Sequence, residues 1–176
     1  MRRFILPLIL FTLFIIEGTI MQVFAPDRYG QDFLVIPRFA FIIVVFISIF
    51  WGRTTGTVYA LILGVMEDVI YTQLLGVYAF SMALVVYLLA FSYKIFKTNV
   101  LLLMITAIVA TIFLDYLVYG IYSIIGITDF FHDRFFYVRL LPSIVVNLVF
   151  VIIFVYPMRK LLQFLQKKED IEEKMS

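Results

Sequence analysis

Four acidic residues of this chain stand inside long apolar stretches, where a charged side chain is costly. They are Glu17, Glu67, Asp68 and Asp115, and a neutral amide, Asn147, has a similar setting. A charge at the centre of a lipid bilayer costs about 2.5–3.5 kcal/mol on insertion scales, so such residues often bind a proton or a ligand. They can also join helices through hydrogen bonds, and we expect this structural role for them here.

The composition indicates that these residues lie in a bilayer. The 176 residues are 64% hydrophobic and 15% charged, whereas a soluble domain has roughly 45–50% apolar and 25% charged residues. Cysteine is absent, which excludes disulfides and thiolate metal sites. The sequence therefore predicts an integral membrane protein, and we expect no nucleic-acid partner.

Six apolar runs approach the ~20 residues that a helix needs to cross a bilayer. The runs are continuous, which favours helices over barrel strands, whose apolar residues alternate. We expect an all-α polytopic domain over residues 1–158 and a basic amphipathic cytoplasmic tail over 159–176. The predicted spans are 4–24, 35–51, 55–72, 76–93, 99–125 and 138–157. The first run is too long for a signal-peptide core and lacks a small-x-small cleavage site, so we expect it to remain.

Lysine and arginine predict that both termini are cytoplasmic, because positive charge is enriched in cytoplasmic loops. With the N-terminus inside, ten basic residues fall in cytoplasmic segments: Arg2, Arg3, Arg53, Lys94, Lys97, Arg159, Lys160, Lys167, Lys168 and Lys174. Four fall outside: Arg28, Arg38, Arg134 and Arg139.

The third predicted span carries small residues at every fourth position, followed by a carboxyl and a hydroxyl. This stripe consists of Gly56, Ala60, Gly64, Asp68 and Thr72, and Gly76 follows it in the turn. Residues four apart share one helix face, and small side chains let another helix approach closely. The stripe is a candidate surface for helix packing or partner binding. Asp68 is expected to accept hydrogen bonds from another helix, whereas Glu67 is rotated by ~100° and faces a different neighbour.

The fifth predicted span carries a second polar stripe, formed by Thr111, Asp115, Tyr119 and Tyr122. In the predicted topology all four acids fall in the outer half of the bilayer. We therefore expect an outer polar cluster made of Glu17, Glu67, Asp68, Asp115 and Tyr119. The simplest arrangement brings the second stripe close to the first.

The sequence does not indicate an enzyme. It contains no GxSxG, HExxH or Walker motif, and the spans lack a nucleophile with a neighbouring base. His132, between Asp129 and Asp133, is a poor match to any metal geometry. We expect no cofactor, no metal and no catalytic residue.

The segment Gly64-Val65-Met66-Glu67-Asp68, followed by Gly76 and the apolar run 77–89, resembles the Gly-x-x-x-Asp then Leu-Gly pattern of the bacterial rod shape-determining MreD family. The short basic N-terminus, the length and the number of spans also fit. Glu67 beside Asp68 departs from the apolar run expected there, so either carboxyl could fill the family role.

This resemblance implies a fold similar to the S-components of energy-coupling-factor transporters, and a non-catalytic scaffold in the bacterial cytoplasmic membrane. Its implied partners are MreC first, then MreB, RodA and a class B penicillin-binding protein of the cell-wall elongation complex. The alternative is a substrate-binding subunit of a vitamin-type uptake transporter, with the acids lining a pocket. A proton-coupled channel is a third possibility, although the inner half of the bundle offers no polar path.

The predicted tail has apolar and basic residues at helical spacing. Leu161, Leu162 and Leu165 share one face, with Lys167 and Lys168 beyond. We expect this face to lie on anionic lipid, and docking of a cytoskeletal protein is the alternative.

Overall fold

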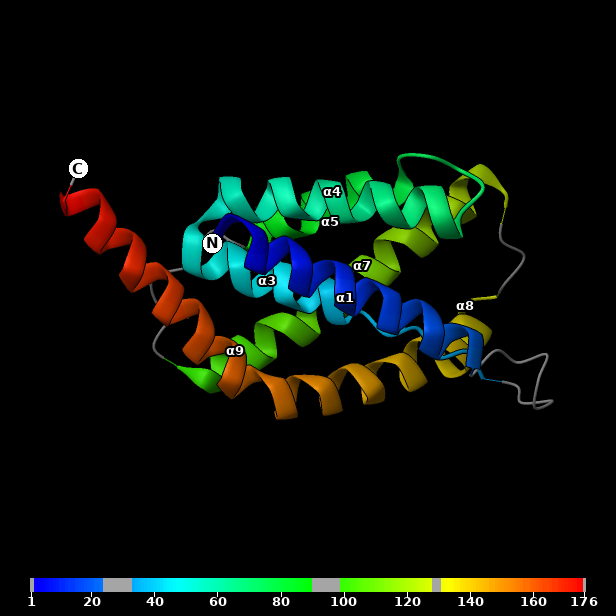
Figure 1. Cartoon of the computed structure of the whole chain (residues 1–176). Coiled ribbons are helices and arrows are strands. Elements are labelled where there is room, and N and C mark those ends of the chain that lie inside the picture. The colour runs from blue at the N-terminus through cyan, green and yellow to red at the C-terminus, as the bar shows by residue number, and fades with distance from the viewer. Residues whose placement is uncertain (1, 24–32, 90–98, 128–130, 176) are drawn as a thin grey trace.

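The computed structural model describes residues 2–23, 33–89, 99–127 and 131–175, and all regular structure in these ranges is helical (Figure 1). The long helices are α1 (Arg2–Val23), α4 (Arg53–Tyr71), α7 (Val100–Ile125) and α9 (Leu141–Met175). Two shorter helices are α3 (Phe39–Trp51) and α5 (Val77–Leu89). A three-residue α8 (His132–Arg134) and a π-helix, η2 (Phe135–Leu140), lead into α9.

Three helical stretches are long and apolar enough to cross a membrane: Ile5–Val23, Val100–Ile125 and His132–Lys167. The other three predicted spans correspond to α3, α4 and α5. The helix α3 has 13 residues, or about 20 Å at 1.5 Å per residue, less than the ~30 Å of a bilayer core. The helix α5 is described over 13 residues, up to Leu89. An extended segment, residues 33–38, precedes α3. Residues beyond Leu89 in the fourth predicted span lie outside the described ranges.

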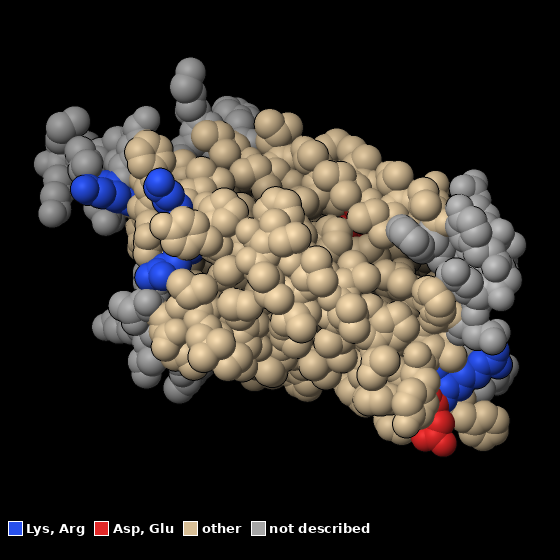
Figure 2. Space-filling model, turned by 90° about the horizontal axis from the view of Figure 1, so that it is seen from below, with Lys and Arg blue, Asp and Glu red and all other residues tan. Residues whose placement is uncertain are grey.

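The helix α3 is the centre of the bundle. Its residues from Phe39 to Phe50 are all buried, and it packs against α1, α4, α5, α7 and α9. Its sequence is apolar on every side except at Ser48, as expected for a helix surrounded by others. The face seen in Figure 2 is almost entirely free of charged side chains over a broad band, and charged side chains gather at its two ends.

The small residues of α4 lie where neighbouring helices approach it. A Cβ added at Gly64 would lie 2.5 Å from the Cα of Ala79 in α5, and one added at Gly56 would collide with Ser48 in α3. Ala60 is fully buried. The stripe predicted from the sequence is therefore used inside the bundle, between α4 and the helices α3 and α5.

The chain becomes helical earlier than predicted before the last span. The last span was predicted at 138–157, but residues 132–140 are already helical and continue into α9. The six residues of η2 are wound as a π-helix, a rare conformation that is frequent at functional sites.

The predicted tail, residues 159–176, does not begin as a segment of its own. The helix α9 runs through its start without a break, from Leu141 to Met175. Met158, Leu162 and Leu165 are buried in the main hydrophobic core. Gln166 donates a hydrogen bond to the carbonyl of Phe50 at the end of α3. Leu162 and Leu165 therefore contact the bundle, not lipid or a cytoskeletal protein. The last turns of α9 extend beyond the bundle in Figure 1.

Candidate functional site: a buried polar cluster

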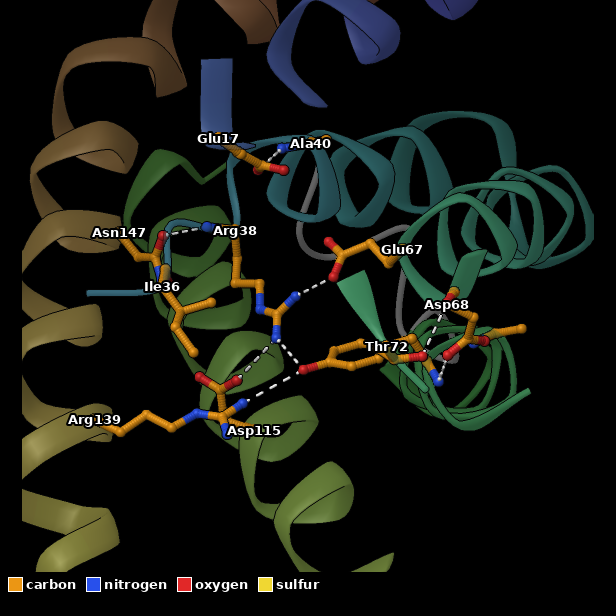
Figure 3. Close-up of polar contacts among 12 residues, drawn as sticks. Glu17, Ile36, Arg38, Ala40, Glu67, Asp68, Thr72, Asp115, Arg139 and Asn147 are labelled. Atoms are coloured by element: carbon orange, nitrogen blue, oxygen red, sulfur yellow. Dashed lines mark hydrogen bonds and ion pairs between the residues drawn. The ribbon is translucent and has the colours of Figure 1, made fainter. Parts of the chain in front are cut away.

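Polar side chains from five helices and from the extended segment meet inside the bundle (Figure 3). We call this group the buried polar cluster. Its members are Glu17, Arg38, Glu67, Asp68, Tyr78, Asp115, Ser143 and Asn147. Each of them is at least nine-tenths buried. The core around them is apolar, so their polar atoms depend on one another and on nearby backbone groups.

Arg38 is the centre of the cluster. It is the residue before α3 and is 2% exposed. Its Nη1 donates to Oε2 of Glu67 at 2.6 Å, and its Nη2 donates to the Tyr78 hydroxyl at 3.0 Å. The same Nη2 lies 3.5 Å from Oδ1 of Asp115. One guanidinium therefore connects the start of α3 with α4, α5 and α7.

The charges around Arg38 explain how acids are tolerated here. An unpaired ion in a low-dielectric interior is strongly unfavourable, and pairing with well-aligned hydrogen bonds offsets much of that penalty. Arg38 faces two carboxylates, and its guanidinium also lies 4.8 Å from the centroid of the Tyr78 ring. A planar guanidinium can serve several acceptors at once, which a lysine cannot do equally well.

The extended segment before α3 is held by α9. The amide of Ile36 donates to Ser143 Oγ at 3.0 Å, and the amide of Arg38 donates to Asn147 Oδ1 at 2.8 Å. Ser143 and Asn147 are four residues apart and so share one face of α9. Non-helical backbone at membrane depth is tolerated only where protein or water satisfies it. These two side chains supply such partners.

Two other acids hold the starts of the two short helices. Glu17 of α1 accepts a hydrogen bond from the amide of Ala40, at the start of α3, at 2.6 Å. Asp68 of α4 accepts from the amides of Gly76, Tyr78 and Ala79, at the start of α5, each at 2.9 Å. The first amides of a helix have no partner within it, and its positive dipole end favours a carboxylate. Each short helix is thus capped by an acid from the long helix before it.

The structure brings together most of the residues that the sequence analysis singled out. Glu67 and Asp115 meet at Arg38, whereas Glu17 and Asp68 bind separate helix starts. Glu67 and Asp68 face different partners, as their angular separation predicts. Thr72 donates to the carbonyl of Asp68, and Gly76 occupies the turn with a φ of 101°, a value that favours glycine. Tyr119 stacks on Phe135, with ring centroids 4.2 Å apart.

The two polar stripes meet at one end, where Tyr122 of the second stripe forms a side-chain hydrogen bond with Thr72 of the first. The helix α7 packs against α3, α5 and α9, and the small residues of α4 face α3 and α5. The link between Asp115 and α4 passes through Arg38, which also binds Glu67. The two stripes are therefore close, as the sequence predicts, and Asp115 reaches α4 through the residue before α3.

Arg38 is the main residue that the sequence analysis misplaced. It was counted among the four basic residues of outer segments, but it lies inside the bundle. Two features of the sequence indicate that Arg38 is buried. It falls within the predicted span 35–51, and the buried acids Glu67 and Asp115 need a cation. Nothing in the sequence indicated that Tyr78 and Ser143 would join the buried polar cluster. Of the other residues in the charge count, Arg28, Lys94 and Lys97 lie outside the described ranges.

In the part of the chain that the structure describes, no group of three or more His, Asp or Glu side chains is placed to hold a metal ion. His132 lies near the rings of Tyr116 and Tyr119. Asp129, its other predicted neighbour, lies outside the described residues. The cluster thus offers carboxylates that are engaged by an arginine and by backbone amides.

The model of the family described as rod shape-determining protein MreD matches residues 2–165. The chain belongs to the MreD family. It is 30% identical over 168 residues to the rod shape-determining protein MreD of Bacillus subtilis, a match that covers 96% of this chain and 98% of the relative. No solved structure is significantly similar to the chain, so the likeness to S-components stays a prediction.

Membership of the MreD family and the apolar helices together identify a membrane protein with a role in determining rod shape. The match to the MreD model includes every member of the buried polar cluster, because it runs from the start of α1 to residue 165 of α9.

Proposed function

We propose that this protein is a non-catalytic scaffold of the cell-wall elongation complex in the cytoplasmic membrane of a rod-shaped bacterium. It binds MreC and, in the same complex, works with MreB, RodA and a class B penicillin-binding protein. Through these contacts it coordinates peptidoglycan synthesis and maintains rod shape. Membership of the MreD family is the main support for this proposal.

The observation that carries the non-catalytic part is the engagement of the buried acids. Glu67 pairs with Arg38, Asp68 accepts three backbone amides, and Glu17 accepts one. A catalytic acid needs access to a substrate and a suitable geometry toward it. These carboxylates are instead used to fix helix starts and helix contacts, which suits a rigid frame.

A rigid frame can present its outer helix faces to the membrane spans of partners. Large apolar side chains are exposed on α1, α4 and α9. They include Leu8, Phe11 and Ile15 of α1, Val58, Leu61 and Val65 of α4, and Val145, Val149 and Ile152 of α9. In a bilayer such faces contact lipid or the helices of other proteins.

The proposed topology has six membrane crossings and both termini in the cytoplasm. The alternating directions of α1, α3, α4, α5, α7 and α9 along the bundle support it (Figure 1). Moving Arg38 from the outer segments into the bundle strengthens the charge asymmetry, because ten inner basic residues then oppose three outer ones.

Depletion of the protein in its own host tests the proposal. Cell shape and newly inserted wall material are followed by microscopy, and MreC is captured from solubilised membranes before and after depletion. We expect cells to round up, with dispersed wall insertion, and tagged protein to retain MreC. Cells that stay rod-shaped but require a supplemented nutrient would contradict the scaffold and favour the uptake subunit.

A further inference from the structure

An apolar groove lies between α1 and α4. Its volume is about 330 Å³, within the roughly 300–1,000 Å³ usual for ligand pockets. Its walls carry no charged residue. Pro7, Leu10 and Phe11 line it from α1, and Tyr59, Ile62, Leu63 and Met66 line it from α4.

Beyond the groove, toward their C-terminal ends, α1 and α4 touch. The rings of Phe14 and Tyr71 lie 5.5 Å apart. A side chain at Gly18 would collide with the Tyr71 hydroxyl, so the glycine permits this close approach. The groove residues lie in the first half of α1 and around the middle of α4.

The chemistry of the walls favours a flexible apolar chain as occupant. Helices that pack against each other in membranes use small residues, which allow their backbones to come close. The groove walls carry proline, phenylalanine, tyrosine, leucine, isoleucine and methionine instead. These large side chains hold a second helix away, but a lipid acyl chain adapts to the space between them.

Positive charge gathers at the end where the groove-lining helices begin. The helix α1 starts at Arg2-Arg3, and α4 starts at Arg53. In Figure 1 these two starts lie at the same end of the bundle. Pro7 is about one helical turn after Arg3, so an acyl chain in the groove would place its headgroup near the first turn of α1. Basic residues at a membrane surface attract anionic lipids.

We propose that the groove between α1 and α4 binds one acyl chain of an anionic phospholipid, whose phosphate lies beside the first turn of α1. Lipid binding at this site does not depend on the proposed binding of MreC. It would tie the bundle to anionic lipid in the leaflet on the side where α1 and α4 begin.

Fluorescence quenching by brominated lipid tests the site. Trp51 is the only tryptophan, so a Trp51→Phe background allows one tryptophan to be placed at will. Ile62→Trp puts it in the groove, and Leu61→Trp is the matched control. Ile62 and Leu61 are neighbours with similar exposure, 53% and 50%, but Leu61 does not line the groove. Met66→Trp is a second groove variant, in case Ile62→Trp does not fold.

The vesicles are phosphatidylcholine with increasing brominated phosphatidylglycerol or brominated phosphatidylcholine. We expect brominated phosphatidylglycerol to half-quench the groove tryptophan at a several-fold lower lipid fraction than brominated phosphatidylcholine does. The control tryptophan should give the same quenching curve with both lipids. Adding Arg2→Gln and Arg3→Gln should remove the preference at the groove.

Three results would overturn the proposal. They are equal quenching by the two lipids at the groove position, a preference that survives removal of both arginines, and an absence of quenching because a second copy or another helix fills the groove.

Discussion

Arg38 Nη1 and Glu67 Oε2 are 2.6 Å apart, and this ion pair joins the residue before α3 to the C-terminal half of α4. The two side chains are 3% and 9% exposed. Their pairing, extended by Asp115 and Tyr78, makes the position of the central helix depend on α4, α5 and α7. The acids that suggested a membrane function are thus the groups that assemble the bundle.

Removal of the Arg38 guanidinium should destabilise the protein strongly. Arg38→Met leaves Glu67 and Asp115 buried without their cation, and breaking a buried pair in this way costs about 3–5 kcal/mol. We expect a clearly lower Tm in detergent, measured by fluorescence-detected gel filtration after heating.

Lys160→Met is the control for Arg38→Met, because Lys160 is an exposed cation of α9. It should change the Tm little. An Arg38→Met protein as heat-resistant as the original chain would show that the ion pair does not hold the bundle together.

Asp68→Asn should weaken the start of α5. The two carboxylate oxygens of Asp68 accept three amide hydrogen bonds, but asparagine has one acceptor oxygen and would turn an NH₂ group toward an amide. We expect a loss of about 1–3 kcal/mol, measured as a lower Tm. Asp133→Asn, at an exposed acid, should have almost no effect. Equal Tm values for the two variants would argue against the cap.

Two glycine substitutions should differ in sign. Gly64→Ala places a methyl group 2.5 Å from the Cα of Ala79, so α4 and α5 must move apart and the Tm should fall. In α7, a Cβ at Gly120 meets nothing within 4 Å. Gly120→Ala should be neutral or stabilising by up to about 1 kcal/mol, because alanine favours helix. Similar Tm changes for both would contradict the close packing of α4 against α5.

Asn147→Leu should loosen the extended segment before α3. Asn147 accepts from the amide of Arg38, and its own amide nitrogen lies 3.5 Å from the carbonyl of Ile36. Leucine has a similar size but leaves a buried backbone amide without its partner, a loss of about 1–3 kcal/mol. Faster proteolysis near residues 33–38 than in the original chain is the expected readout. Leu148→Ala, at an exposed neighbour, is the control and should leave proteolysis unchanged.

Local sequence signals predicted the helices, the α4 stripe and the separate directions of Glu67 and Asp68. These features depend on periodicity within one segment, so they can be read from spacing alone. The role of Arg38 could not be predicted from spacing, because it depends on which helices surround the start of α3. The burial of Leu162 and Leu165 was also missed, since the same amphipathic pattern suits either lipid or the end of a bundle.

The most direct test of a structural role for the buried polar cluster is rescue by an apolar replacement. A variant with Arg38→Met, Glu67→Leu and Asp115→Leu removes all three charges together, and such replacements of buried ions are often neutral or stabilising. It is expressed in the depleted host, and cell shape is scored against the amount of folded protein in the membrane. We predict that the variant restores rod shape when it accumulates to the normal level. A folded and equally abundant variant that leaves the cells round would show that these charges act in a proton, ligand or partner site, and would contradict the account.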